Sequence, residues 1–524
     1  MTPEPAQEPT LAKLSDEERN ERFDRLQERM RGVWEIMRRN EEGESVVVIP
    51  SVSVDRVGER TGSLQQAYEE RFLVLLLLLR HPRLRIIYVT SMPIAPKIVE
   101  YYLALLPGVI PSHARARLSL ISVGDASSRP LSEKLLERPR LLSLIRSLVP
   151  NPLRSHLVPY NTTPLERDLA IELGIPMYGA DPRFFPLGTK SGCRELFADL
   201  GVRHPLGFEN LRSIEDVIDA LIRLREARPD ITTALVKLNE GVSGEGNALV
   251  DLHNMTAPGS PREREEIESR VQQMEFELPG TPFSAYAAKL AERGGIVEER
   301  ITGVVLRSPS VQLRVTPFGE VELLSTHDQV LGGPSGQSYS GCSFPADFEY
   351  AKMISADAQR IGERLAREGV LGRFAIDFVV VRSSDGSWTP YAIELNLRKG
   401  GTTHPYLTLQ FLTDGRYDSE TALFLTPSSR EKHLVATDHL ESSILRGLTI
   451  DDLFDIVARH GLHFDPARQR GVVFHMISCL TELGRVGLTA VGDTPASAKA
   501  MYHKAERILL EEARESLVER ALPT

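Results

Sequence analysis

The 524-residue chain has little of what defines several protein classes. It contains three cysteines, Cys193, Cys342 and Cys479, which are widely spaced and odd in number, so neither a disulfide framework nor a zinc knuckle is indicated. This cysteine usage is typical of a reducing compartment and favours a cytoplasmic location. The formal net charge is −10, whereas non-specific nucleic-acid binding needs a cationic surface. We therefore expect no nucleic-acid partner.

Long hydrophobic runs are also missing. The most conspicuous run, residues 72–79, is bounded by Arg71 and Arg80, which is far short of the roughly 20 residues that span a bilayer. The N-terminus is acidic and has no apolar signal core, so secretion is not indicated. We expect no membrane partner, and we interpret residues 72–79 as a buried helix.

The length exceeds what one hydrophobic core normally organises, so we expect two to four domains. A capping box at Ser15–Glu18 begins an N-terminal docking helix. Strand-like runs then alternate with helical stretches, which predicts a parallel α/β unit over residues 1–150; the strands are 46–49, 85–89 and 118–123 and the helices 64–80 and 94–106. A proline-rich stretch from Pro150 marks the first boundary. A last α/β module, residues 428–524, contains helices at 453–460 and 495–518 and a strand at 471–477.

The strongest chemical signal is a pair of strand-like segments, residues 374–381 and 392–398, joined by a turn-rich stretch. Because side chains alternate along a strand, Glu394 and Asn396 share one face, and folding about the turn brings Asp377 nearly opposite Glu394. Two carboxylates and an amide oxygen are suitable ligands for Mg²⁺ carrying nucleotide phosphates. A solvated strand face is the alternative, but Asp377 lies in an otherwise continuous apolar run.

A second signal lies upstream. Lys237 stands in an apolar strand, residues 235–238, and a loop containing Gly241, Gly244 and Gly246 leads directly to another strand, residues 248–250. Such glycines let backbone N–H groups approach anionic oxygens closely. The order strand, loop, strand disfavours a Walker or dinucleotide site, in which a helix follows the loop. An ordinary tight hairpin is the alternative.

Further candidates are weaker on their own. Lys190, before a helix at residues 191–200, offers a second cation. The strand 295–301 has a backbone that could pair with a purine edge, and residues 235–301 together predict a lid of strands with one charged helix, 261–277. Arg314, in a strand, is either a partner for a carboxylate or an exposed cation. Cys342 is interpreted as a buried thiol, and His475 as a satisfied core histidine.

Taken in chain order, these pieces resemble the ATP-grasp superfamily, over roughly residues 182–412, and in particular its carboxylate–amine ligases. The order is a lysine before a helix, a strand lysine with a glycine loop, Val-Glu-Glu, then Asp and Glu-x-Asn-x-Arg. A narrower resemblance is to peptide ligases of the pheganomycin type. It rests on four segments: 325–329, 339–345, 400–405 and 471–476.

The resemblance implies an α/β (α+β) ATP-grasp fold: a Rossmann-like pre-ATP-grasp domain (1–150), an ATP-grasp domain (151–427, lid about 231–301) and a small α/β module (428–524). It also implies ATP and Mg²⁺, with two ions expected. The implied nucleotide contacts are Lys190, Lys237, Gly241, Ser243, Gly244, Glu245, Gly246, Glu298, Glu299 and Ile301; the metal ligands are Asp377, Glu394 and Asn396; the catalytic cations are Arg398 and Arg314. Residues 302–305 supply no carboxylate for the ribose, so its partner is unassigned.

The function implied is ATP-dependent joining of a small carboxylic acid to an amine or peptide through an acyl phosphate, with release of ADP and phosphate, in natural-product biosynthesis. Two alternatives stay open: an ATP-grasp kinase that phosphorylates an alcohol, and a nucleotide-binding scaffold without turnover. The complete set of metal ligands disfavours the scaffold. Self-association into a homo-oligomer is also left open.

Overall fold

The computed structural model describes residues 11–39, 44–53, 62–241, 244, 246–332, 336 and 338–521. The chain begins with η1 (Leu11–Lys13), α1 (Asp16–Gln27) and α2 (Met30–Arg39). The Ser15 capping box forms as predicted, with Ser15 Oγ accepting from the Glu18 amide and the Glu18 carboxylate from the Ser15 amide. Met30, Val33 and Trp34 of α2 are buried and pack against Tyr178.

The N-terminal unit is built on a parallel sheet in the order β3-β2-β1-β4, which confirms the predicted α/β organisation. The inner strands β1 and β2 are mostly apolar, and their side chains enter two hydrophobic clusters, one on each face of the sheet. The strands are β1 (Glu44–Ile49), β2 (Leu84–Thr90), β3 (Leu118–Ser122) and β4 (Ser155–Pro159). The helices are α3 (Gly62–Glu70), η2 (Arg71–Arg80), α4 (Pro96–Ala104), α5 (Pro111–Arg115), α6 (Leu131–Leu136), α7 (Pro139–Leu148), η3 (Pro152–Arg154) and α8 (Pro164–Leu173). Because β4 pairs with β1, this sheet continues beyond residue 150.

The run at residues 72–79 forms most of η2, a 3₁₀ helix that is buried as expected. It belongs to one hydrophobic cluster with residues of β1, β2 and the C-terminal part of the chain, among them Tyr406, Leu434 and Leu509. The run is therefore one of the apolar contacts that join the N-terminal unit to the rest of the molecule. No helix in the described part of the chain is both long enough and apolar enough to cross a bilayer.

The lid is a five-stranded sheet in the order β5-β9-β6-β7-β8. Its strands are β5 (Gly207–Leu211), β6 (Thr233–Leu238), β7 (Asn247–Asp251), β8 (Glu275–Phe276) and β9 (Gly295–Glu299), with helices α10 (Ile214–Ala227), α11 (Glu263–Gln272) and α12 (Phe283–Arg293). The expected charged helix is α11, but the expectation of only one helix between residues 235 and 301 was wrong, because α12 is a second helix there. Its buried residues Tyr286 and Leu290 lie four positions apart, the spacing that turns both side chains toward the lid core.

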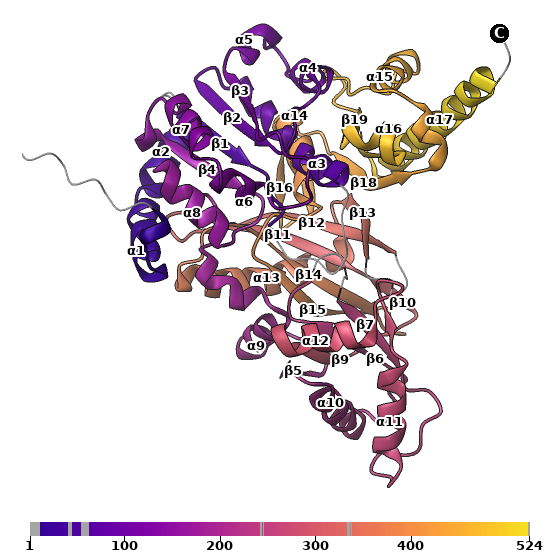
Figure 1. The fold of residues 1–524 in the computed structure, drawn as a ribbon. Coiled ribbons are helices and arrows are strands. Elements are labelled where there is room, and N and C mark those ends of the chain that lie inside the picture. The colour runs from indigo at the N-terminus through magenta and orange to yellow at the C-terminus, as the bar shows by residue number, and fades with distance from the viewer. Residues whose placement is uncertain are drawn as a thin grey trace, which may run out of the picture.

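The central layer is a nine-stranded sheet in the order β10-β14-β11-β12-β13-β18-β20-β19, with β15 paired to β14. The strands are β10 (Val305–Arg307), β11 (Pro309–Val315), β12 (Val321–Gly332), β13 (Ser338–Phe344), β14 (Gly372–Arg382), β15 (Trp388–Asn396), β18 (His433–Glu441), β19 (Gly471–His475) and β20 (Arg485–Gly492). The last three strands extend this sheet and do not build one of their own. In Figure 1 the lid lies below the central sheet, while the N-terminal unit and the C-terminal helices lie above it.

The remaining elements surround this sheet. They are η4 (Pro182–Gly188), α9 (Lys190–Asp199), α13 (Phe348–Glu368), α14 (Thr403–Thr413), the small pair β16 (Arg416–Asp418) and β17 (Leu423–Leu425), η5 (Ser443–Gly447), α15 (Ile450–Arg459), η6 (Ile477–Cys479), α16 (Leu480–Leu483) and α17 (Pro495–Ala521). Helix α9 packs on β15 and contacts β5 and β9 of the lid, so it joins the lid to the central sheet. The helices predicted at 191–200, 453–460 and 495–518 are therefore confirmed as α9, α15 and α17.

Candidate active site

The acidic hairpin has the geometry that its sequence predicts. Strands β14 and β15 are antiparallel, with Asp377 opposite Glu394 and Ala375 opposite Asn396, and a bulge follows Asp377. Asn396 Nδ2 donates to Asp377 Oδ2 at 3.0 Å, and Gln329 Nε2 donates to Asp377 Oδ1 at 2.8 Å. Two carboxylates and the amide oxygen of Asn396 therefore lie close together on one face of the central sheet.

The two carboxylates of this hairpin are in different electrostatic environments. Burial, together with the charge of Glu394, raises the pKa of Asp377 to about 6. Burial alone would also raise the pKa of Glu394, but the nearby positive charges, Lys190 foremost, outweigh it and the pKa is lowered. Lys190 Nζ lies 2.6 Å from Glu394 Oε1. The hairpin thus presents one firmly ionised carboxylate beside one whose ionisation is disfavoured by burial and by the facing negative charge.

The two predicted lysines face this hairpin from different elements. Lys190 is the first residue of α9, and Thr189 caps that helix by accepting from the Gly192 amide. Lys237, on β6, is 3% exposed, and its Nζ lies 2.7 Å from Glu298 Oε1. Both lysines are held by carboxylates and are directed into one cleft.

Glu298, on β9, is bound by a second cation that the sequence reasoning missed. Arg194 Nη1 lies 2.9 Å from Glu298 Oε2, and both side chains are buried. Burial would raise the pKa of Glu298, but Lys237 and Arg194 outweigh it and lower the pKa. Arg194 is four residues after Lys190 on the same helix face, a spacing that could have revealed it. The carboxylate of Glu298 therefore positions Lys237, in addition to any role of its main chain.

Glu299 and Ile301, the other predicted nucleotide contacts near the end of β9, lie where the lid meets the central sheet. Glu299 is fixed to Leu206, because its amide donates to the Leu206 carbonyl at 2.8 Å and its Oε1 accepts from the Leu206 amide at 2.9 Å. Ile301 follows the end of β9 and lines the cleft. This arrangement leaves the ribose partner unassigned, as the sequence did.

The glycine loop joins β6 to β7 as a hairpin, with Lys237 opposite Asn247. Gly244 and Gly246 have φ values of +81° and +93°, a region that side chains rarely adopt. The start of the loop is tied to α9, because the Asn239 carbonyl accepts from the Lys190 amide and Asn239 Oδ1 accepts from the Ser191 amide. Ser243 and Glu245 lie outside the described residues.

These groups line one continuous cleft between the lid and the central sheet. The predicted residues that the cleft brings together are Lys190, Lys237, Gly241, Gly244, Glu298, Glu299, Ile301, Asp377 and Glu394. Leu235, Leu306, Leu331 and Phe378 supply apolar walls. Gly246 is turned toward the lid core, where its carbonyl accepts from Tyr286 Oη at 3.0 Å. The cleft has cations and carboxylates at one end and apolar walls beyond them.

A second cleft, of about 310 Å³, adjoins the first and shares Gly241 and Glu394 with it. Arg398 and Asn396 line it from the central sheet. The sequence reasoning missed its opposite wall, which the N-terminal unit and the following loop supply with polar and aromatic groups: Ser53, Asn161, Thr162, Thr163, Asp181 and Phe185. Thr162 Oγ1 donates to the Leu397 carbonyl at 3.2 Å and so holds the two walls together.

Arg314 does not join these groups. Its Nε donates to Glu322 Oε2 at 2.6 Å, and its guanidinium lies over the ring of Trp34 at 4.9 Å. Ser310 on the same strand is opposite Asp377, so Arg314 lies four residues further along β11 and away from the acidic hairpin. We leave it out of the proposed catalytic set. Cys342 is buried, which raises the pKa of its thiol to about 12 and is consistent with an unreactive side chain.

Comparisons with known proteins agree with this architecture. Residues 186–277 and 281–420 match the family described as "IQCH-like, ATP-grasp", and residues 452–505 match the "PGM1 C-terminal domain". The chain is 30% identical over 465 residues to the L-propargylglycine–L-glutamate ligase of Streptantibioticus cattleyicolor, covering 87% of this chain and 92% of that protein. It is 23% identical over 443 residues to IQ motif-containing protein H of Danio rerio, covering 76% of this chain and 42% of that protein.

Solved structures share the fold at low sequence identity. The biotin carboxylase domain of the Hydrogenobacter thermophilus 2-oxoglutarate carboxylase, solved with MgADP and bicarbonate, superposes with a TM-score of 0.53 at 13% identity and covers 89% of this chain and 90% of that chain. Biotin carboxylase from Campylobacter jejuni gives a TM-score of 0.52 at 13% identity, covering 90% and 95%. The fold is thus the ATP-grasp fold. Because it is 30% identical to the Streptantibioticus ligase over most of both chains, this chain belongs to the ATP-grasp ligase family. This confirms the superfamily resemblance.

Proposed function

We propose that the protein is an ATP- and Mg²⁺-dependent carboxylate–amine ligase that joins amino acids or small peptides through an acyl phosphate. The observation that carries this proposal is the junction of the two clefts. The first has the cations and carboxylates of a nucleotide site, the second has room for a small polar molecule, and both are lined by Glu394 and Gly241. A phosphoryl group at the end of the first cleft would therefore face a substrate in the second.

The first cleft suits ATP by its charges. Lys190 and Lys237 would contact the phosphates, and the glycine loop would offer backbone N–H groups above them. The apolar walls at the other end suit a purine, with Glu298 to Ile301 beside its edge. The solved biotin carboxylase domain of the same fold holds MgADP, which supports the same ligand here.

The acidic hairpin suits Mg²⁺ by its donor chemistry. Asp377, Glu394 and Asn396 supply the hard oxygen ligands that this ion prefers, and a bound cation would offset the repulsion between the two facing carboxylates. We propose that these residues hold one or two ions. When bound, Mg²⁺ would offset the negative charge of the phosphates during phosphoryl transfer.

The second cleft suits an amino-acid substrate. Arg398 offers a guanidinium for a carboxylate, while Asp181 and the hydroxyl and amide groups of Asn161 and Thr163 offer partners for an amine. The Streptantibioticus relative is named for two amino-acid substrates, which supports this class. The narrower relation to pheganomycin-type peptide ligases, and a role in natural-product biosynthesis, belong to the same proposal.

The chemistry requires alignment and charge compensation, without a protein nucleophile. A carboxylate oxygen of the acid attacks the γ-phosphorus of ATP, and the bond from that phosphorus to the β,γ-bridging oxygen breaks. ADP is released, and the acid becomes an acyl phosphate. The amine nitrogen then attacks the acyl carbon, loses a proton and releases phosphate. Lys190, Lys237 and Arg398 lower the repulsion between the two anions, and the glycine loop excludes water from the acyl phosphate.

Hydroxylamine trapping tests this proposal. The full-length protein is incubated with MgATP and each of a panel of amino acids, with hydroxylamine in place of the amine, and hydroxamate and ADP are measured together. A hydroxamate formed in an acid-dependent manner supports the acyl phosphate. A stable phosphorylated alcohol would instead identify a kinase, and nucleotide binding without any turnover would identify a scaffold.

A matched pair of variants links the result to the site. Arg398→Gln should lower hydroxamate formation at least 100-fold, because it removes a charge that faces the transferring group. Arg367→Gln, an exposed position on α13, should leave the rate unchanged. Equal rates for both variants would remove Arg398 from the mechanism.

A further inference from the structure

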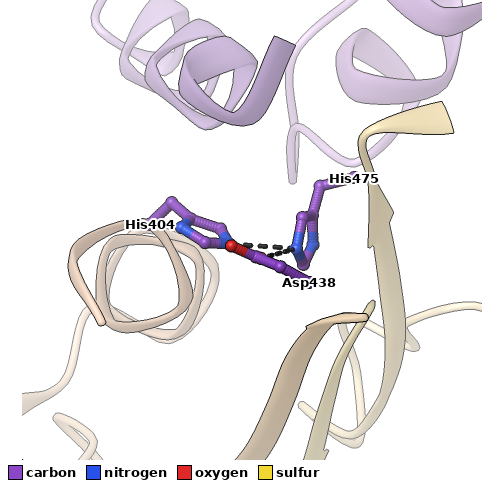
Figure 2. A group of neighbouring side chains, drawn as sticks. All are labelled: His404, Asp438 and His475. Carbon is purple, nitrogen blue, oxygen red and sulfur yellow. Dashed lines mark hydrogen bonds and ion pairs between the residues drawn. The ribbon is translucent and has the colours of Figure 1, made fainter. Parts of the chain in front are cut away.

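A buried group of three side chains lies outside both clefts, among segments that the proposed reaction does not use. His404 comes from α14, Asp438 from β18 and His475 from β19, and Figure 2 shows the three pointing toward one another. They are 2%, 2% and 3% exposed. From this arrangement we propose that His404, Asp438 and His475 form a second metal site, which holds one divalent ion of zinc type in a structural role.

The atoms that converge are the ones that bind metals. His475 Nε2 lies 2.7 Å from Asp438 Oδ1, His404 Nε2 lies 3.2 Å from the same oxygen, and the two Nε2 atoms are 3.0 Å apart. One ion at the usual distance of about 2 Å from nitrogen and oxygen ligands can reach all three atoms at once.

Protons can also occupy this triangle, but they crowd it. If both imidazoles carry their proton on Nε2, both N–H groups donate to the single oxygen Asp438 Oδ1 while the two nitrogens lie 3.0 Å apart. If only one Nε2 is protonated, its N–H is shared between Asp438 Oδ1 and the other Nε2, whose lone pair lies close to the lone pairs of the carboxylate. A cation at the centre turns all three lone pairs into favourable interactions.

The surroundings hold two of the three ligands in place, whereas His404 Nδ1 is buried without a hydrogen-bond partner among the described residues. Arg71 Nη1 bonds the other oxygen of Asp438 at 2.6 Å, which leaves Oδ1 for the centre, as outer groups around metal-binding carboxylates commonly do. Gly487 is opposite His475 in the sheet, and a Cβ there would lie 2.1 Å from His475 Nε2. Glycine at this position is therefore necessary for the ring to reach the cluster.

The ligand types indicate which metal is held and why. Two imidazoles and one carboxylate suit Zn²⁺ and its neighbours, in contrast to the oxygen ligands of the acidic hairpin. With Arg71, the site ties α14, β18 and β19 to η2 of the N-terminal unit. Since α14 begins shortly after Arg398, such a tie would fix the segment that carries this residue.

The test uses Co²⁺ as a spectroscopic probe on the full-length protein. The chelator-treated protein is saturated with ADP and excess Mg²⁺, so that the acidic hairpin is occupied, and Co²⁺ is then titrated. We expect one equivalent to bind with the intense visible absorption of four- or five-coordinate Co²⁺ and to be displaced by Zn²⁺. If only the weak absorption of six-coordinate Co²⁺ appears, the proposal is overturned.

Variants localise the bound ion. His404→Gln and His475→Gln should each weaken Co²⁺ binding at least 100-fold, whereas His503→Gln, at an exposed position on α17, should bind as the wild type does. Unchanged binding in both cluster variants would overturn the proposal. If a cluster variant does not fold, nitrogen hyperfine coupling from two imidazoles to Cu²⁺ in the wild type decides the question, and its absence counts against the site. None of these measurements depends on turnover, so a negative result for the metal site can be told apart from a negative result for the ligase proposal.

Discussion

Replacing Glu394 by Gln should change nucleotide affinity in opposite directions with and without Mg²⁺. The substitution preserves the shape of the side chain and removes one of the two facing negative charges. Glu394 is bonded to Lys190 at 2.6 Å, and its side chain is 24% exposed. Loss of its charge therefore leaves Lys190 without its carboxylate and leaves Asp377 as the only anionic ligand of the proposed ion.

The magnitudes follow from these contacts. Without Mg²⁺, the negative charge of Glu394 no longer repels the phosphates, and Lys190 is free to bind them. The binding free energy of the nucleotide should therefore become more favourable by about 1–2 kcal/mol, the size expected for one charge in a partly solvated site. With Mg²⁺, loss of a charged ligand should weaken binding at least 100-fold, or about 2.7 kcal/mol. The free energy of unfolding of the ligand-free variant should fall by about 1–2 kcal/mol, since the broken ion pair between Glu394 and Lys190 is only partly buried.

Calorimetric titration with a non-hydrolysable ATP analogue, in excess Mg²⁺ and separately in a chelator, measures both affinities without any knowledge of the substrates. Glu275→Gln, at an exposed position of the lid strand β8, is the matched control and should change neither. An equal loss of affinity in both conditions would refute the metal-ligand role of Glu394 and assign it to nucleotide binding or folding alone. Unchanged affinities would remove it from the site.

Three further outcomes are expected. Lys237→Met should weaken ATP binding at least tenfold by calorimetry while the protein stays folded, because Glu298 keeps Arg194 as its partner; unchanged affinity would return Lys237 to a structural role. Gly244→Val should lower amide formation more than ADP release when both are measured in one reaction, because its φ of +81° disfavours valine and a poorly closed loop admits water; equal losses would mean that the loop does not shield an intermediate. Burial and the charge of Arg373 lower the pKa of Lys399 from 10.5 to about 7. The unfolded chain therefore binds more protons between these values, and the unfolding free energy should rise from pH 7 toward pH 10, by a few kcal/mol at most. Lys399→Met should flatten that rise in denaturant titrations, and an unchanged slope would contradict the assignment.

Several features of the candidate site were predictable because they are local in the sequence. Asp377 and Glu394 belong to one hairpin, so strand alternation and a single turn fix their facing positions. The lysine at the start of α9 and the hairpin around Gly244 and Gly246 are equally local, since a cap or a positive φ is set within a few residues. The order of these pieces along the chain was enough to indicate the fold.

Contacts across long sequence separations were not predictable in this way. The sequence offered Arg194 and Glu298 as separate charges, and only the packing of α9 against β9 pairs them. Likewise, no pattern placed Asn161 to Thr163 opposite Arg398, because the wall that they form depends on how the N-terminal unit docks on the central sheet. The position of Arg314 was likewise not predictable, since its place along β11 takes it toward Trp34 and Glu322.

Residue periodicity, turn residues and hydrogen bonds between neighbours in the chain were enough to indicate the acidic hairpin, the glycine loop and many of the helices and strands. The sequence left His475 as an ordinary core histidine. Only the tertiary structure brought it to His404 and Asp438, from a helix and two strands that the extended central sheet and the buried 72–79 run hold together. Hydrophobic burial decides which segments meet and has no direction of its own, so the chemistry that arises where they meet could not be deduced from the segments separately.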